Sequence, residues 1–186
     1  MTELAVLQAV RLKGRVTRDQ LGSELVDSLI ERGFLIDGPM VRLSPEGRAR
    51  LDDLLTEERS SVDTAAVDAA YDAFRSVNAD FKAIVTEWQV RGGQPNTHDD
   101  PDYDAAVLAR LDDAHRRVIP VVDAVSAELP RLKSYSAKLS AALDRVHAGD
   151  TQWLSRPLID SYHTVWFELH EELILATGKT RKAEDG

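Results

Sequence analysis

Cysteine is absent from the 186-residue sequence. Its absence excludes disulfides, thiolate zinc sites, iron–sulfur clusters and cysteine nucleophiles, so a bound metal would need His, Asp or Glu ligands. Long apolar runs are also absent: no stretch approaches the roughly 20 residues of a membrane span. The start MTELAVLQAVRLKG lacks the charged-then-apolar layout of a secretory signal. We therefore expect a soluble, cytoplasmic protein that has no membrane partner.

The sequence has no excess of positive charge. Its net charge of −9 argues against a surface coated for non-specific nucleic-acid binding, because phosphate contact depends on Lys and Arg. Residues 1–50 hold 8 Lys/Arg and 7 Asp/Glu, whereas residues 51–186 hold 15 and 25. A nearly neutral N-terminal segment is therefore joined to an acidic body. The apolar fraction of 43% is enough to build a hydrophobic core.

Motifs of common enzymes are missing as well. The sequence shows no glycine-rich phosphate loop, no Ser–His–Asp order with a strained serine turn, and no paired acid–base carboxylates in a recognisable cleft. We therefore expect a protein that is not an enzyme and that carries no cofactor.

Residues 1–61 are expected to form the first domain. Apolar residues recur at helical spacing over residues 4–12, and Gly14 is a suitable end for that helix. Thr17 is a good N-cap for a second helix over RDQLGSEL, and a third helix ends at Gly33. This order of helices predicts a small, mainly helical domain.

A hairpin and a fourth helix follow. Two β-like runs, Phe34 to Ile36 and Met40 to Leu43, are separated by a turn, and Ser44 then caps a helix that has Pro45 at its first position. The stretch LIERGFLIDGPMVRLSPEGRARL resembles the third helix, wing and following helix of bacterial MarR-type regulators. This resemblance covers about a third of the chain. It implies a winged-helix, helix-turn-helix domain used for DNA binding and transcription regulation.

The residues themselves leave DNA contact and protein docking both open. The expected recognition helix offers Glu24, Asp27 and Glu31, and carboxylates that face phosphates are unfavourable. Six Lys and Arg residues of this domain could still form a small surface that contacts phosphates. The candidate nucleic-acid-binding residues are Arg11, Lys13, Arg15, Arg18, Arg32 and Arg42.

Residues 62–178 are expected to form a helical-bundle domain. One helix runs from about residue 63 to residue 91, and a second starts at Pro101 after an Asp100 cap and carries Pro120 inside it. Pro130 marks the next joint, a third helix ends near residue 146, and a fourth runs from about residues 155–157 to Gly178. Short joints between four helices predict an antiparallel four-helix bundle. Residues 179–186 are expected to form a frayed tail.

Several polar side chains fall on faces that should be buried. At 100° per residue, His163 and His170 lie within the apolar arc of the fourth helix, Asp112 and His115 within that of the second, and Asn78 near the centre of that of the first. Buried polar groups need partners, and the space between these helices is where a ligand is expected. The candidate ligand-binding residues are Asn78, Trp88, Asp112, His115, Tyr162, His163, Trp166 and His170.

Three interpretations of these polar residues stay open: a structural hydrogen-bond network, a small-molecule pocket, and a metal site. The spacing Asp112-x-x-His115 is similar to that of carboxylate-bridged bundles, but a second such pair and further glutamates are missing. His163 and His170 are about 10.5 Å apart along a helix axis, which is too far to share an ion. We therefore expect no metal site, although a metal-dependent bundle enzyme stays an alternative.

The stretches FKAIVTEWQVR, NTHDDPDYDAAVLARLDDAH and DSYHTVWFELHEELI resemble an uncharacterised actinobacterial helical domain. That domain follows a winged helix, sometimes behind the swivelling phosphohistidine domain of phosphoenolpyruvate-utilising enzymes. The first hypothesis is thus a transcription regulator whose helical domain forms a homodimer or senses a small ligand. The alternative is an accessory protein that does not bind DNA and that partners a phosphoenolpyruvate-utilising phosphotransfer enzyme. This sequence has no phosphohistidine domain of its own.

Overall fold

The computed structural model describes residues 2–21 and 23–179 of the chain. These residues are mainly helical, which confirms the predicted fold class at that level. The chain divides into two compact units, Met1–Val62 (unit 1) and Asp63–Gly186 (unit 2). Of the expected frayed tail, residues 180–186 lie outside the described residues.

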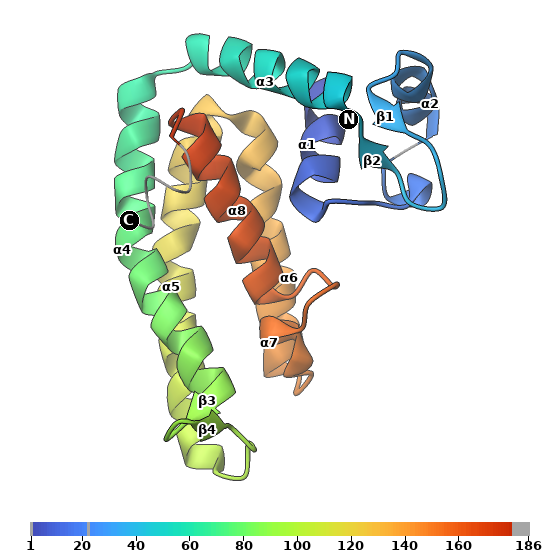
Figure 1. The fold of residues 1–186 in the computed structure, drawn as a ribbon. Coiled ribbons are helices and arrows are strands. Elements are labelled where there is room, and N and C mark those ends of the chain that lie inside the picture. Colours follow the sequence, from blue (N-terminus) through green and yellow to red (C-terminus); the bar gives the residue numbers. More distant parts are fainter. Residues whose placement is uncertain (1, 22, 180–186) are drawn as a thin grey trace. The chain divides into compact units, whose positions relative to one another are not determined.

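Unit 1 contains helices and one small hairpin (Figure 1). Its elements are α1 (Glu3–Lys13), η1 (Arg18–Gln20), α2 (Ser23–Glu31), β1 (Leu35–Ile36), β2 (Arg42–Leu43) and α3 (Pro45–Ser60). The second helix expected from the sequence is only the 3₁₀ turn η1, so its predicted length was wrong. The segment between the Thr17 cap and the start of α2 at Ser23 is too short for a full α-helix.

The hairpin is tied to the segment that precedes η1. Leu35 pairs with Leu43 and Ile36 with Arg42; the two leucines are buried, and Ile36 and Arg42 share the exposed face. Val16 adds a bridge to Val41, with N–H···O distances of 3.1 and 2.7 Å in the two directions. This bridge was not expected, because the isolated Val16 shows no strand pattern in the sequence.

The start of α3 is held against the chain before β1. The Ser44 hydroxyl accepts from the Gly47 N–H at 2.8 Å, which confirms the predicted cap, and donates to the Gly33 carbonyl at 2.6 Å. A Cβ atom on Gly47 would lie only 1.9 Å from the Phe34 carbonyl oxygen. Glycine is therefore required here for the close approach of two backbones.

The described residues of unit 2, 63–179, form four long helices with short elements between them. Its elements are α4 (Thr64–Gln89), β3 (Val90–Arg91), β4 (Gln94–Pro95), α5 (Pro101–Glu128), η2 (Pro130–Lys133), α6 (Ser134–His147), α7 (Gln152–Ser155) and α8 (Tyr162–Ala176). The Asp100 cap and the joint at Pro130 lie where the sequence predicts them, and α5 continues through Pro120.

Two expectations about these helices were wrong. Residues 90–91 are not the end of a helix but a short strand paired with residues 94–95. The last helix begins at Tyr162, several residues later than expected, because Leu158 has a φ of 69° and Ser161 caps the first turn. A positive φ at a leucine is incompatible with a helix that continues through it.

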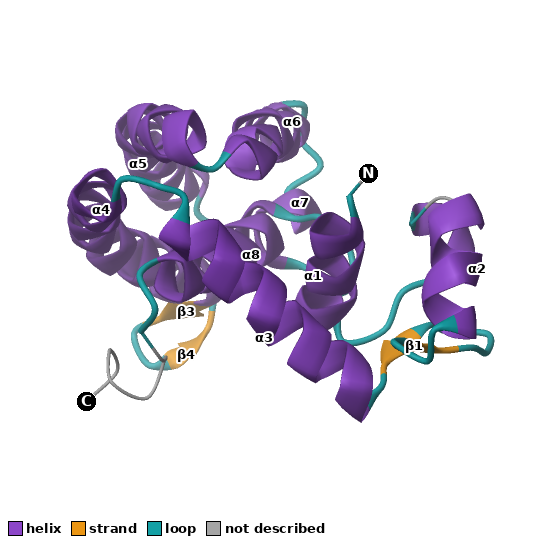
Figure 2. Ribbon diagram, turned by 90° about the horizontal axis from the view of Figure 1, so that it is seen from above, coloured by secondary structure: helices purple, strands orange, loops and turns teal. Residues whose placement is uncertain are grey.

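The four long helices of unit 2 pack as a closed circuit. Helix α4 contacts α5, α5 contacts α6, α6 contacts α8, and α8 contacts α4 (Figure 2), and successive long helices run in opposite directions (Figure 1). Their buried side chains include Phe74, Phe81, Leu111, Leu139 and Trp166. No helix formed by the described residues has the length and apolar character needed to cross a membrane.

Candidate functional site

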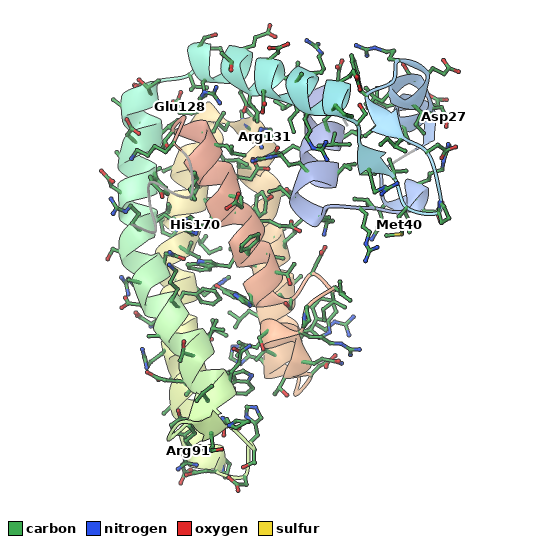
Figure 3. The ribbon with its side chains drawn as sticks, in the orientation of Figure 1. Asp27, Met40, Arg91, Glu128, Arg131 and His170 are labelled. Atoms are coloured by element: carbon green, nitrogen blue, oxygen red, sulfur yellow. The ribbon has the colours of Figure 1, made fainter. Side chains whose placement is uncertain are left out.

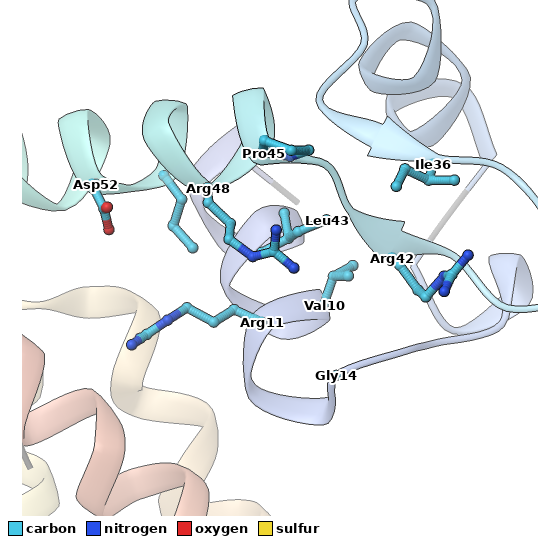
Figure 4. A pocket seen from close by; sticks show the side chains of 10 residues that line it. Val10, Arg11, Gly14, Ile36, Arg42, Leu43, Pro45, Arg48 and Asp52 are labelled. Carbon is cyan, nitrogen blue, oxygen red and sulfur yellow. The ribbon is translucent and has the colours of Figure 1, made fainter.

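Unit 1 carries a groove of about 450 Å³ between the end of α1, the hairpin and the start of α3 (Figure 4). We call it the arginine groove. Its lining residues are Val10, Arg11, Gly14, Ile36, Arg42, Leu43, Pro45, Arg48, Leu51 and Asp52. Three of them are arginines with exposed side chains, and one is a carboxylate.

Two of the candidate nucleic-acid-binding residues, Arg11 and Arg42, come together in this groove. Sequence reasoning missed Arg48, which lies in the first turns of α3. The sequence does place Arg48 and Asp52 on one face of that helix, because they are four residues apart. That face turns toward the hairpin, which only the fold reveals.

The structure places Arg18 and Arg32 elsewhere, in ion pairs. Arg18 contacts both Asp27 of α2 and Asp37 of the hairpin turn, and its guanidinium lowers the pKa of Asp37. Arg32 bonds to Glu3 at 3.2 Å. Lys13 ends α1 and Arg15 follows it, both exposed and outside the groove lining.

Unit 2 carries a second groove, of about 340 Å³, between α4 and α8. We call it the aromatic groove. Its lining residues are Asn78, Phe81, Lys82, Val85, Thr86, His163, Trp166, Phe167 and His170. Four of these are candidate ligand-binding residues, namely Asn78, His163, Trp166 and His170.

The floor of the aromatic groove is built from partnered groups. The Trp166 Nε1–H donates to the Asn78 Oδ1 at 2.9 Å, and the Phe81 and Trp166 rings stack with centroids 4.2 Å apart. His170 is buried on the side of α8 that faces α4 (Figure 3), with its ring 5.3 Å from the Phe74 ring. The predicted inward orientation of His170 is confirmed.

His163 does not point into the core, so that prediction was wrong. The residue is exposed at the rim of the aromatic groove, with its ring 6.1 Å from that of Phe81. It lies 100° from the fully buried Tyr162, at the border of the apolar arc. Partial burial still lowers the pKa of His163.

Asp112 and His115 also lie apart from the aromatic groove. The His115 Nδ1 and the Tyr162 hydroxyl are 3.1 Å apart inside unit 2, and burial lowers the pKa of His115. Asp112 instead pairs with His147 of α6 at 2.8 Å, near the surface. Their side chains therefore do not converge on one ion, and the described residues contain no group of three or more His, Asp or Glu side chains arranged to hold a metal.

Trp88 forms a separate contact at the end of α4. Its buried ring lies 4.3 Å from the ring of His98, and the His98 Nδ1 is 2.9 Å from the Asp104 carboxylate. Trp88 and Tyr162 were expected to line a pocket with Trp166, but neither lines the aromatic groove. The eight candidate ligand residues thus divide among four places.

A buried ionic cluster was missed altogether. Glu172 of α8 is 3% exposed and pairs with Arg131 of η2, while Glu168 is 4% exposed and lies 4.0 Å from Lys138. Burial raises the pKa of Tyr135 beside them. Sequence reasoning could not predict that these two glutamates are buried, because the cations that pair with them lie on other elements, η2 and α6.

Protein-family models, curated proteins and solved structures were all compared with the chain, and none of them matches it.

Proposed function

We propose that this chain is a DNA-binding transcription regulator. In this proposal unit 1 is a winged helix and unit 2 is an antiparallel four-helix bundle that senses a small ligand. The observation that carries it is the bridge between Val16 and Val41, made by two backbone hydrogen bonds. It puts a third extended segment beside the hairpin.

With the bridge included, the order of elements in unit 1 supports the proposed winged helix. That order is helix, extended segment, short helical turn, helix, and a hairpin whose loop is the wing, followed by α3. The resemblance of residues 29–51 to MarR-type regulators supports the same reading. Because a fold hosts many functions, the DNA-binding role is an analogy that needs its own test.

The test is a fluorescence-anisotropy titration of the full chain. It uses labelled duplex DNA from upstream of the coding sequence and a random duplex of equal length, each across a series of salt concentrations. A regulator should bind its site roughly 10³-fold or more tightly than random duplex at physiological salt. Equal affinity for both duplexes at every salt concentration would rule out the regulator.

The aromatic groove supports the sensing part of the proposal. Its volume of about 340 Å³ lies within the roughly 300–1,000 Å³ of small-molecule sites. Among the described residues, its lining includes aromatic rings, one lysine and two histidines, and no carboxylate. A thermal-shift screen of small molecules should yield hits that the rim variant His163→Ala weakens; hits that bind this variant equally well would place the site elsewhere.

A specific observation also supports the accessory-protein alternative. The outer face of α2 exposes Glu24, Asp27 and Glu31, and it fits a basic protein surface better than a phosphate backbone. The partner in this alternative is a phosphoenolpyruvate-utilising phosphotransfer enzyme. A native pull-down should recover such an enzyme with the wild-type chain and lose it with Glu24→Lys/Glu31→Lys; recovery by both chains would exclude α2 as the docking face.

A further inference from the structure

Six of the eight arginines of unit 1 fall into two sets, of which the first is paired with carboxylates; Arg15 and Arg59 belong to neither set. Arg18 contacts two carboxylates, those of Asp27 and Asp37. Arg32 and Arg50 both contact Glu3, at 3.2 and 2.8 Å. Each of these guanidinium groups is already paired with a carboxylate of the same unit, so a phosphate would have to compete with an existing partner.

The second set is Arg11, Arg42 and Arg48, which line the arginine groove. Within residues 2–21 and 23–179, none of these three side chains has an ion pair, a hydrogen bond or a ring contact. Figure 4 shows Arg11 at one end of the groove in that view, Arg42 at the other end and Arg48 between them. They come from α1, β2 and α3, so folding alone brings them to one groove.

The arginine groove carries a net positive charge, although unit 1 as a whole does not. Residues 1–62 carry 9 Lys/Arg and 11 Asp/Glu, yet the described lining of the groove has three guanidinium groups and one carboxylate, that of Asp52. Its walls include the buried side chains of Val10, Leu43 and Leu51. An apolar wall lowers the local dielectric and so strengthens the attraction of an anion.

The chemistry of three guanidinium groups selects the anion. Arginine presents a planar fork of donors that matches phosphate oxygens in a bidentate way, and it stays charged at all physiological pH values. A phosphate in the groove would gain charge-assisted hydrogen bonds and would relieve the mutual repulsion of the three arginines.

The outer face of α2 has the opposite character. Glu24 and Glu31 are exposed there, and the nearby Arg18 is already neutralised by Asp27 and Asp37. Helix α2 has an acidic residue in its first turn and no basic residue in its last turn. A duplex brought against this face would meet carboxylates first, which costs affinity.

We propose that the arginine groove of unit 1 binds phosphate groups through Arg11, Arg42 and Arg48, and that it holds the backbone of duplex DNA in place of the outer face of α2. The assignment to DNA rests on the proposed function; the assignment to phosphate rests on the groove alone.

The DNA arm of the experiment measures binding of a duplex to the full chain as a function of salt. Each phosphate contact adds about 0.9 to the slope of log K against log salt, so Arg11→Ala/Arg42→Ala/Arg48→Ala should reduce the slope by about 2.7. Arg75→Ala, at an exposed arginine of unit 2, removes one charge outside unit 1 and should leave the slope unchanged. Substituting the three groove arginines by lysine should keep the slope and weaken binding, because the bidentate geometry is lost.

The phosphate arm measures pyrophosphate binding by calorimetry with the same chains. Its purpose is to separate a free phosphate compound from a nucleic-acid backbone as the source of the anion. Wild-type chain should bind pyrophosphate, and the triple alanine variant should not. Circular dichroism checks that the variant is folded.

The outcomes separate the two assignments. If the triple variant loses duplex binding and the Glu24→Gln/Glu31→Gln variant binds the duplex as the wild type does, both the phosphate and the DNA assignments are supported. Arginine-dependent binding of pyrophosphate without duplex binding keeps the phosphate site and overturns the DNA assignment together with the proposed function. Duplex binding that survives in the triple variant but changes in the α2 variant overturns the inference and leaves the proposed function standing. Binding of neither probe overturns both.

Discussion

The arginine groove of unit 1 and the aromatic groove of unit 2 are similar in size, about 450 and 340 Å³. They differ in whether their polar side chains have interaction partners. In the arginine groove three charged side chains have no partner among the described residues. In the aromatic groove Asn78 bonds to Trp166, and His170 lies against aromatic rings. Unpartnered exposed charges contribute little to folding, whereas partnered buried groups do.

This difference has a consequence for experiments. Substitutions in the arginine groove should change binding and leave stability nearly unchanged, while substitutions in the floor of the aromatic groove should destabilise unit 2. The three tryptophans, at positions 88, 153 and 166, all belong to unit 2, and unit 1 has neither Trp nor Tyr. Tryptophan fluorescence therefore follows unit 2 alone, and circular dichroism follows both units.

The largest effect is expected for Trp166→Ala. Trp166 is 2% exposed and stacks on Phe81, and truncation of a buried aromatic residue costs about 3–5 kcal/mol. Urea unfolding followed by circular dichroism measures the loss. Trp153→Ala, at a half-buried tryptophan, is the control and should cost clearly less. Equal losses in both variants would show that the floor of the groove is not part of the core.

A smaller loss is expected for Asn78→Ala. The Trp166 Nε1–H would lose its acceptor and stay buried, which costs about 1–3 kcal/mol. Trp166→Phe removes the donor instead, and combining it with Asn78→Ala completes a double-mutant cycle in urea unfolding. A coupling of at least about 0.5 kcal/mol is expected; additive losses would deny that this hydrogen bond stabilises unit 2.

The stability of unit 2 should fall in acid because of His115. Burial lowers its pKa below the ordinary value of 6.5, so between the folded pKa and 6.5 the unfolded chain binds a proton that folded His115 does not. Unit 2 therefore loses stability as the pH falls through that window. Fluorescence-monitored unfolding from about pH 7.5 to about pH 5 should show a shallower decline for His115→Gln. A decline as steep as that of the wild type would assign the effect to other groups, such as His163.

The smallest effect is expected for the triple alanine variant of Arg11, Arg42 and Arg48. Each substitution of an exposed side chain without a partner usually changes stability by less than about 0.5 kcal/mol in either direction, so the three changes should partly cancel and their sum should stay small. Arg50→Ala is the matched control, since it breaks the 2.8 Å pair with Glu3 and should cost up to roughly 1 kcal/mol. Circular dichroism measures both variants. A triple variant that loses more than this control would contradict the comparison of the two grooves.

The features predicted correctly are those with local signals. The caps at Ser44 and Asp100 and the joint at Pro130 depend on a few neighbouring residues, and a capping hydroxyl or carboxylate acts within one turn. The bridge from Val16 to Val41 could not be predicted, because its two partners are far apart in the chain.

The candidate sites were predicted less completely than the fold. Arg11 and Arg42 were identified as cations, but only the packing of α3 adds Arg48 to them. Helical periodicity put His163 in the apolar arc, although a residue at the border of an arc can turn either way. Glu172 and Arg131 lie on different elements, so no spacing rule could pair them.

By itself the sequence determined the mainly helical class, most of the helix ends, and the absence of every cysteine-based site. These depend on composition and on contacts within a turn or two of chain. Only the tertiary structure decided which cations are neutralised and which are available. Arg18 pairs with Asp37, whereas Arg48 pairs with no carboxylate among the described residues. Electrostatic pairing depends on distance in space, and the chain order of charges does not specify that distance.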